Sequence, residues 1–241
     1  NEPQPLNAFR QVNTLGTLNL ARQAVDSGVK RFVYLSTIKV NGEQTDNKPF
    51  FADDVPDPQE PYAVSKYEAE QQLFKLSQET GLEVVVIRPA LVYGPGVKGN
   101  FLRLMQLVSR GWPLPLGGIH NQRSLVSITN LCSLISHCLN HNNAAGQVFL
   151  VSDGQDLSTT ELFDKIAYAL HKPSRLFHLP KTSLYWLTRF LKRSAEYERL
   201  FGSLQVDITK NKQLLGWEPQ QPLEKGLQQV ADWYRNELTG Q

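Results

Sequence analysis

The fold of this chain is constrained most by two short apolar runs, 31–36 and 83–88, and by the helical stretch 62–80 between them. Both runs are rich in β-branched and aromatic residues, which is typical of strands buried on both faces. Strands joined through a helix can pair in parallel, and the helices then cover both faces of the sheet. The sequence therefore predicts an α/β fold with a doubly wound parallel sheet. Further strands are predicted at 124–128 and 147–151, and further helices at 6–27, 100–110, 130–139, 159–170 and 223–238.

Composition narrows the classes of function. Hydrophobic residues make up 41% of the 241 residues and charged residues 20%, which is ordinary for a soluble globular protein. The net charge is +2 without a basic run, so we expect no nucleic-acid partner. Cys132 and Cys138 lie on one predicted helix at a spacing that suits neither a disulfide nor a metal site, and the histidines show no ligand spacing. With no signal peptide or membrane-spanning apolar run, we expect a cytoplasmic protein that binds no metal and has no transmembrane segment.

A tyrosine and a lysine four residues apart, Tyr62 and Lys66, indicate the chemistry. At that spacing both side chains share one helix face, so the ammonium can lie beside the phenol. A cation there favours the phenolate and lowers a pKa that is about 10 in free tyrosine. Such a tyrosine can exchange a proton with a substrate hydroxyl or carbonyl near neutral pH. Thr37 directly follows the first strand and can bond the same oxygen, so the three residues together indicate redox chemistry at a carbinol carbon.

Alone, this pair also fits a tyrosine packed on a solvated helix beside an extended lysine. The order of the surrounding motifs favours the chemical interpretation. They are the helical segment 13–20, the strand end 36–42 (Ser-Thr-Ile-Lys-Val-Asn-Gly), Pro61 before Tyr62, and 84–96 (Val-Val-Val-Ile-Arg-Pro-Ala-Leu-Val-Tyr-Gly-Pro-Gly). In this order they resemble the extended short-chain dehydrogenase/reductase family of nucleotide-sugar epimerases, dehydratases and reductases. The resemblance extends through essentially the whole chain.

The resemblance implies a Rossmann-type dinucleotide-binding domain and a smaller, mainly helical C-terminal substrate lobe. We expect 1–93 and 124–151 to form the first, and 94–123 and 152–241 to form the second. The resemblance also implies NAD or NADP as cofactor and a UDP-sugar as substrate. The resemblance also implies a homodimer that forms through the predicted helices 6–27 and 62–80.

The Gly-rich part of such a domain is not found in this sequence. Family members of this kind begin with a strand, a Gly-x-x-Gly-x-x-Gly turn and a helix that hold the dinucleotide pyrophosphate. Here Gly94, Gly96 and Gly99 come only after the helix that carries Tyr62. We expect that about 80 residues, the first half of the dinucleotide fold, are missing from this chain. A chain starting at Asn1 is expected neither to hold the cofactor well nor to turn over, so the catalytic predictions concern the complete protein.

The resemblance also assigns site residues. Thr37, Tyr62 and Lys66 are expected to be catalytic. The residues expected on the cofactor side are Asn13, Ser36, Tyr62, Lys66, Pro89 and Ala90, and those expected on the substrate side are Thr37, Leu91, Asn100, Arg123 and Arg199.

Physical chemistry supports these assignments unevenly. Asn100 heads a predicted helix and Arg123 precedes a short strand, and both a helix N-terminus and a guanidinium bind phosphate oxygens. A simple N-cap explains Asn100 about as well, and a surface role is the alternative for Arg123. Arg199 fits a solvated helix face better than a second phosphate clamp. For Asn13, helix N-terminal hydrogen bonding is nearly as good an explanation as cofactor contact.

The positions after Thr37 bear on the reaction. In the sugar 4,6-dehydratases of the family, the catalytic threonine is followed by Asp-Glu, which eliminate water across C5 and C6. The matching residues here are Ile38 and Lys39, which disfavours dehydration. In a 4-ketoreductase, Tyr62 would protonate the C4 oxygen while a reduced nicotinamide delivers hydride. In a 4-epimerase, Tyr62 would first remove the C4 hydroxyl proton, and the ketose would take hydride back on its other face.

Longer stretches, 36–43, 97–101, 113–117 and 152–154, are similar to a bacterial surface-polysaccharide branch of the family. That branch makes UDP-N-acetylquinovosamine by reducing a 4-keto-6-deoxy sugar, and its members are often labelled UDP-glucose 4-epimerases. Asn41, which replaces the tyrosine of the usual Val-Tyr-Gly, is another mark of it. We therefore predict C4 redox on a UDP-linked N-acetylhexosamine, with the reductase ahead of the epimerase.

An alternative from another class is a non-catalytic protein that binds a UDP-sugar and lacks the dinucleotide half. The intact pair of Tyr62 and Lys66 argues against it. The apolar stretch 184–193, with its interleaved basic residues, fits a lid helix better than a peripheral membrane contact.

Overall fold

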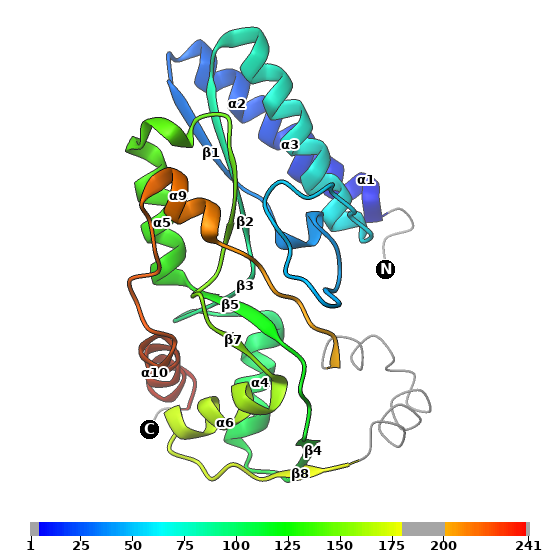
Figure 1. Ribbon diagram of the computed structural model, residues 1–241, viewed down its shortest axis with the longest axis vertical. Helices are drawn as coiled ribbons and strands as arrows, with labels where there is room; N and C mark the ends of the chain where they lie inside the picture. The colour runs from blue at the N-terminus through cyan, green and yellow to red at the C-terminus, as the bar shows by residue number, and fades with distance from the viewer. Residues whose placement is uncertain (1–4, 180–200, 240–241) are drawn as a thin grey trace.

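The computed structural model describes residues 5–179 and 201–239. A three-stranded parallel sheet, in the order β1–β2–β6, runs through the upper part of the molecule (Figure 1). Its strands are β1 (Arg31–Leu35), β2 (Glu83–Pro89) and β6 (Val148–Val151). The central strand, β2, is fully buried from Val84 to Ile87, as the apolar run predicts.

Helices cover both faces of this sheet. On one face, α1 (Pro5–Phe9), the π-helical η1 (Arg10–Gly16) and α2 (Thr17–Asp26) follow one another and pack with α3 (Pro61–Thr80). On the other face lie α5 (Ile128–Asn140) and α9 (Thr209–Leu215). Successive β2 side chains point to opposite faces of the sheet. Val84 and Val86 pack with α2 and α3, and Val85 and Ile87 pack with α5 and α9. This two-sided burial confirms the doubly wound α/β fold.

The lower part of Figure 1 is mainly helical. A second core joins α4 (Gly99–Ser109), α6 (Thr159–Ala169) and α10 (Leu223–Trp233), and η4 (Tyr234–Thr239) continues the last of these. The short strands β3 (Leu91–Tyr93), β5 (Arg123–Ser127) and β7 (Asp156–Leu157) form a second sheet, and β4 (Leu114–Gly117) pairs with β8 (Leu176–His178). In the predicted division, β3 and β5 belong to the dinucleotide domain and β7 to the substrate lobe, and β5 pairs with both β3 and β7. The division of the chain into two domains stays a prediction.

The helix α3 begins and ends at residues that the sequence makes evident. Pro61 occupies the first turn, where its fixed φ and missing N–H cost nothing. Gly81 ends the helix in the left-handed conformation, with φ of 76°. These two signals fix Tyr62 in the first turn and Lys66 one turn later, on the same face.

The polar loop between β1 and α3 is tied to the lower part by the segment 202–207. Isolated bridges join Phe50 to Val206 on one side of the segment and Arg123 to Leu204 on the other. The Thr45 amide also donates to the Ser203 carbonyl over 2.8 Å. The segment therefore lies between the loop and β5.

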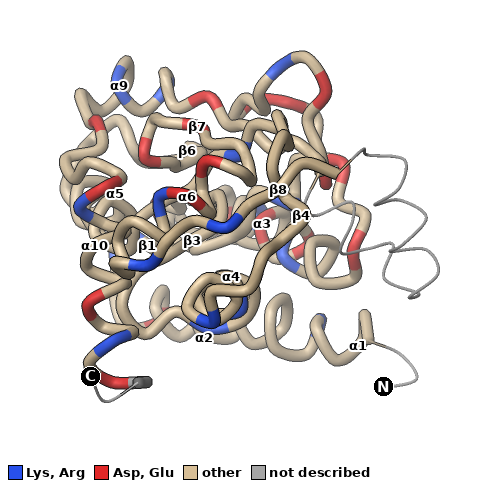
Figure 2. Tube along the Cα trace, turned by 90° about the horizontal axis from the view of Figure 1, so that it is seen from below, with Lys and Arg blue, Asp and Glu red and all other residues tan. Residues whose placement is uncertain are grey.

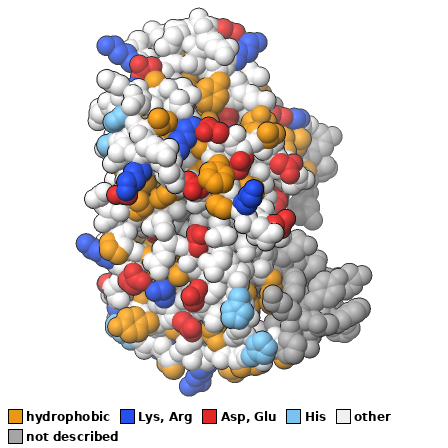
Figure 3. Space-filling view, in the orientation of Figure 1, with side chains coloured by type: hydrophobic (Ala, Val, Ile, Leu, Met, Phe, Trp, Pro, Cys, Tyr) orange, Lys and Arg blue, Asp and Glu red, His pale blue; other side chains and the backbone are white. Residues whose placement is uncertain are grey.

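Charge is spread along the described chain. Acidic and basic positions are interspersed in Figure 2, without a long segment of one sign among the described residues. On the face shown in Figure 3, charged side chains of both signs separate small groups of apolar ones. None of the described helices is both long and apolar enough to cross a membrane.

Candidate active site

Four of the predicted site residues lie at or directly after the carboxyl ends of neighbouring parallel strands, where ligands bind in open α/β sheets. Ser36 directly follows β1, and its amide donates to the Ile87 carbonyl over 2.8 Å. Thr37 caps the 3-10 turn η2 (Ile38–Val40), and its Oγ1 accepts from the Lys39 amide at 3.4 Å. Pro89 ends β2, and the Ala90 amide donates to the Val151 carbonyl over 3.1 Å. Parallel pairing thus brings 36–37 and 89–90 to one edge of the sheet.

The helix α3 brings Tyr62 and Lys66 toward β1 and η1. The half-buried Tyr62 ring meets Phe9 edge to face, with centroids 5.7 Å apart. Lys66 Nζ lies 4.2 Å from the centroid of the Tyr34 ring, a cation–π contact. The Tyr34 hydroxyl donates to the Asn13 carbonyl over 3.5 Å. Lys66 and Asn13 therefore both contact Tyr34.

Asn13 lies inside the long helix formed by α1, η1 and α2, so N-terminal hydrogen bonding does not explain it. Its Nδ2 donates to Ser65 Oγ over 3.0 Å, which joins η1 to α3 between the two predicted catalytic residues. π-helical turns such as η1 occur often at functional sites.

The predicted lowering of the Tyr62 pKa is wrong for this structure. Burial raises the pKa of Tyr62 above its usual value near 10. The expected partner, the Lys66 ammonium, lies over the Tyr34 ring. Tyr62 therefore carries its proton at neutral pH.

The Lys66 pKa is lowered to about 8, because burial disfavours the ammonium while the nearby Glu70 carboxylate partly opposes the effect. An unfolded lysine titrates near pH 10.4, so between about pH 8 and that value the unfolded chain binds more protons than the folded chain. The unfolding free energy contributed by Lys66 should therefore rise with pH across this window.

We expect the wild-type protein to gain stability relative to a Lys66→Met variant as pH rises from about 8 to 10. Urea unfolding of both proteins at the two pH values measures this difference. Lys75→Met, at an exposed position of the same helix, is the control and should show no such change. A difference that is flat or falls with pH contradicts the assignment.

A network of polar side chains that the sequence did not reveal lies beside this site. Lys39 Nζ contacts Glu43 at 2.8 Å and Glu60 at 2.7 Å. A second, buried group joins Asn41, Glu70 and Arg88. Two of these relations are local in sequence, because Glu70 follows Lys66 by four residues and Glu43 follows Lys39 by four. The contacts of Lys39 with Glu60 and of Arg88 with Glu70 and Asn41 join segments distant in sequence.

The residues present fit the nicotinamide end of a dinucleotide. Ser36 Oγ is buried and has no hydrogen-bond partner among the described residues, so it has hydrogen-bonding capacity to offer a ligand. It lies next to Thr37, at the strand edge described above. Tyr62 and Lys66 are half-buried and supply a phenol and an ammonium from α3.

The predicted substrate residues are not all gathered at this edge. Leu91 begins β3 and is half-buried. Asn100 is exposed in the first turn of α4, whose N-cap is Lys98, so the N-cap alternative for Asn100 is wrong. The Arg123 guanidinium donates to the Gly202 carbonyl over 2.9 Å, and burial lowers the Arg123 pKa. Arg199 and the stretch 184–193 lie outside the described residues.

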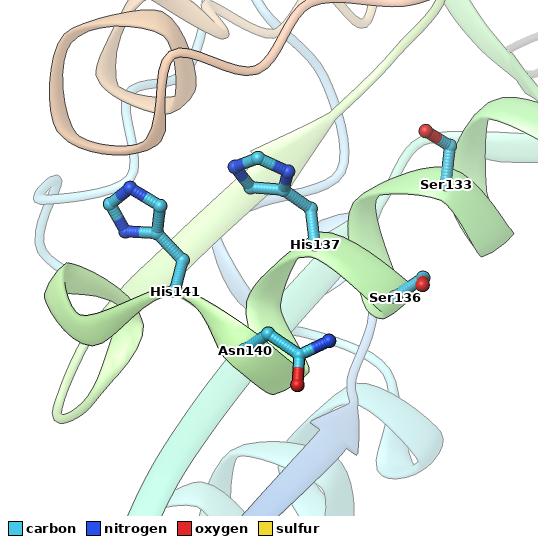
Figure 4. A pocket seen from close by; sticks show the side chains of 5 residues that line it. All are labelled: Ser133, Ser136, His137, Asn140 and His141. Carbon is cyan, nitrogen blue, oxygen red and sulfur yellow. The ribbon is translucent and has the colours of Figure 1, made fainter.

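An open hollow on α5 is separate from these residues (Figure 4). The rings of His137 and His141 lie side by side there, with centroids 5.3 Å apart. His137 Nε2 donates to the Leu215 carbonyl over 2.8 Å, and His141 Nδ1 accepts from the Asn143 amide at 3.2 Å. Because α5 and α3 cover opposite faces of the sheet, the hollow is not part of the candidate site.

Comparison with known sequences supports the resemblance. Residues 2–152 match the sequence model of the NAD dependent epimerase/dehydratase family. A UDP-glucose 4-epimerase of Vibrio cholerae is 52% identical over 232 residues, which cover 95% of this chain and 71% of that relative.

Solved structures have the same fold. The dTDP-glucose 4,6-dehydratase DesIV of Streptomyces venezuelae, solved with NAD bound, superposes with a TM-score of 0.77 at 26% identity, over 98% of this chain and 69% of DesIV. The UDP-glucose 4-epimerase of Thermotoga maritima, solved with UDP-glucose, gives a TM-score of 0.75 at 25% identity, over 95% of this chain and 71% of that one.

Proposed function

The chain belongs to the NAD-dependent epimerase/dehydratase family, and from this we propose that the complete protein catalyses NAD- or NADP-dependent redox at C4 of a UDP-sugar. The observation that carries the proposal is the arrangement of Thr37, Tyr62 and Lys66 at the carboxyl edge of a parallel sheet, with Ile38 and Lys39 after the threonine. A UDP-glucose 4-epimerase and a dTDP-glucose 4,6-dehydratase are among the proteins similar to this chain.

In this proposal the residues of the chain hold the sugar and move one proton. A nicotinamide dinucleotide, when bound, supplies or accepts the hydride at C4. Ser36, Pro89 and Ala90 would line its nicotinamide end. Thr37 Oγ1 would donate a hydrogen bond to the C4 oxygen, and the Tyr62 phenol would exchange a proton with it. Lys66 would contribute its ammonium to the cofactor side of the site.

The 4-ketoreductase is the first candidate, from the similarity of the longer stretches to the reductase branch of the family. Reduction of a C4 ketone needs hydride at carbon and a proton at oxygen, so Tyr62 must begin protonated. Burial raises the Tyr62 pKa, which keeps the phenol in that form. We propose a UDP-4-keto-6-deoxy-N-acetylhexosamine as the substrate, with a role in surface-polysaccharide synthesis.

The second candidate is a UDP-sugar 4-epimerase, acting on UDP-glucose or UDP-N-acetylglucosamine. It is favoured by the 52% identity to the Vibrio cholerae protein of that name. In this reaction Tyr62 first accepts the C4 hydroxyl proton and later returns it, and no net reduced cofactor is consumed. A non-catalytic UDP-sugar-binding protein is the alternative from another class.

The absorbance of reduced nicotinamide during incubation with a UDP-4-keto-6-deoxy-N-acetylhexosamine separates these candidates. The test uses the complete gene product. Stoichiometric loss of reduced cofactor is expected for the reductase. No loss, together with conversion of UDP-glucose or UDP-N-acetylglucosamine to its C4 epimer, would establish the epimerase. Binding of the UDP-sugar without either reaction would establish the non-catalytic alternative.

We also propose a homodimer that uses the helices α1–η1–α2 and α3. Four large apolar side chains on the first of these are exposed: Phe9, Val12, Leu15 and Leu20. A second copy would cover such a surface.

Leu20→Glu is expected to convert the dimer to a monomer, because the side chain, 59% exposed in one chain, would place a charge in the interface. Light scattering after size exclusion of the complete protein measures the mass. Val55→Glu, at a loop position that is 87% exposed, is the control and should remain dimeric. A wild-type monomer contradicts the proposal.

A further inference from the structure

The turn that follows Thr37 is held against α3 at two separate points. The first is an ionic contact at the start of the helix. Lys39 Nζ lies 2.7 Å from Glu60 Oε2 and 2.8 Å from Glu43 Oε2, so one ammonium joins two carboxylates. Glu60 is the N-cap residue of α3, two positions before Tyr62. Lys39 lies two positions after Thr37, and its amide donates to Thr37 Oγ1.

The second point is buried and lies almost three turns further along α3. Arg88 donates to Glu70 through Nε at 3.0 Å and Nη2 at 2.5 Å. Its Nη1 donates to Asn41 Oδ1 over 2.9 Å, and Asn41 Nδ2 donates to the Phe51 carbonyl over 2.9 Å. Asn41, Glu70 and Arg88 are each no more than 3% exposed. The asparagine thus links the turn to β2 and to the loop, and Arg88 extends the link to α3.

Tyr62 and Lys66 lie between these two points on α3, and Thr37 lies at the start of the turn. We propose that Lys39 and Asn41 are positioning residues that fix the Thr37 hydroxyl relative to the Tyr62 phenol. This inference rests on the proposed C4 redox function and assigns a role to two residues other than Thr37, Tyr62 and Lys66. It also explains what Lys39 and Asn41 do at their positions after Thr37.

Charge explains why Lys39 matters although it is partly exposed. An exposed pair of one lysine and one carboxylate contributes little. Here two carboxylates approach one ammonium, and the second oxygen of Glu43 is buried without a hydrogen-bond partner among the described residues. Removing the ammonium leaves like charges close together, which would push the turn and the helix start apart.

Lys39→Met in the complete protein is therefore expected to lower kcat about 10²-fold, because a displacement of about 1 Å at a reacting group has an effect of that size. KM for the UDP-sugar should stay within about threefold, because the proposal gives neither residue a part in binding it. Lys39→Arg should restore most of kcat, because it keeps a cation between the two carboxylates. Asn41→Ala should lower kcat in the same way. Lys75→Met is the matched control, because Lys75 forms only an exposed pair with Glu79 at 4.0 Å.

Hydrogen–deuterium exchange gives a readout that does not depend on activity. Lys39→Met should speed exchange in peptides that cover 37–41 and 60–64, and Lys75→Met should not. If exchange in both peptides is unchanged, or if kcat of Lys39→Met stays within about twofold of wild type, the positioning role is wrong. If wild-type protein turns over no UDP-sugar while Lys39→Met still loosens these peptides, the proposed function falls and the two-point attachment stands.

Discussion

Replacing Tyr62 by phenylalanine in the complete protein is expected to lower kcat about 10³-fold, within the range contributed by a positioned general acid or base. The phenol is the proposed proton donor to the C4 oxygen, and phenylalanine keeps the ring that packs on Phe9 at 5.7 Å. KM for the UDP-sugar should change little, because the lost interaction is made in the transition state. Steady-state turnover with reduced nicotinamide measures kcat and KM. Isothermal titration with UDP measures the affinity for the nucleotide, which should also stay unchanged.

Tyr67→Phe is the control for this result. Tyr67 is also half-buried on α3 and belongs to the turn after Tyr62, but has no part in the proposed chemistry. It should keep wild-type kcat. Turnover of Tyr62→Phe within about tenfold of wild type would contradict its role in acid–base catalysis.

Arg88→Met is expected to have the largest effect on stability, lowering the unfolding free energy by about 3–5 kcal/mol. The change leaves Glu70, which is 1% exposed, as a buried carboxylate without its two guanidinium hydrogen bonds. It also removes the donor to Asn41 Oδ1. Because a folded domain is stable by only about 5–15 kcal/mol, the variant should be close to unfolding at moderate temperature. Urea unfolding followed by circular dichroism measures the loss.

Two further variants test whether the stability loss comes from breaking the buried Arg88–Glu70 pair or from losing any positive charge. Lys75→Met breaks an exposed pair with Glu79 and should change stability by less than about 1 kcal/mol. Arg88→Met combined with Glu70→Leu should be more stable than Arg88→Met alone, because no unpaired carboxylate remains. A loss below about 1 kcal/mol for Arg88→Met would show that Glu70 finds other partners.

Much of the fold followed from local patterns. The apolar run of β2 is long enough to be buried on both faces, and the structure confirms both the strand and its parallel neighbours. Pro61 and Gly81 set the ends of α3 within one residue of the predicted stretch 62–80. The strands β3, β4, β7 and β8 were not predicted, because each has no more than four residues and shows no alternation of its own.

The sequence indicated which residues belong to the candidate site, but not which side chains contact one another there. Thr37, Tyr62 and Lys66 were identified from order and spacing, and their catalytic roles stay a prediction. The effect of Lys66 on the Tyr62 pKa was wrong, since helix geometry alone does not tell that Tyr34 on β1 offers the ammonium an aromatic face.

The sequence by itself determined which segments become strands and helices, the family, and the order of the chemical groups, because periodicity, caps and motif order are properties of neighbouring residues. The tertiary structure decided how those groups meet. Lys39 reaches Glu60 only because the loop 43–60 returns to the end of β1, and Arg88 reaches Glu70 and Asn41 only because α3 packs across β2. Such contacts join side chains far apart in the chain, and their burial and geometry depend on packing that no local pattern encodes.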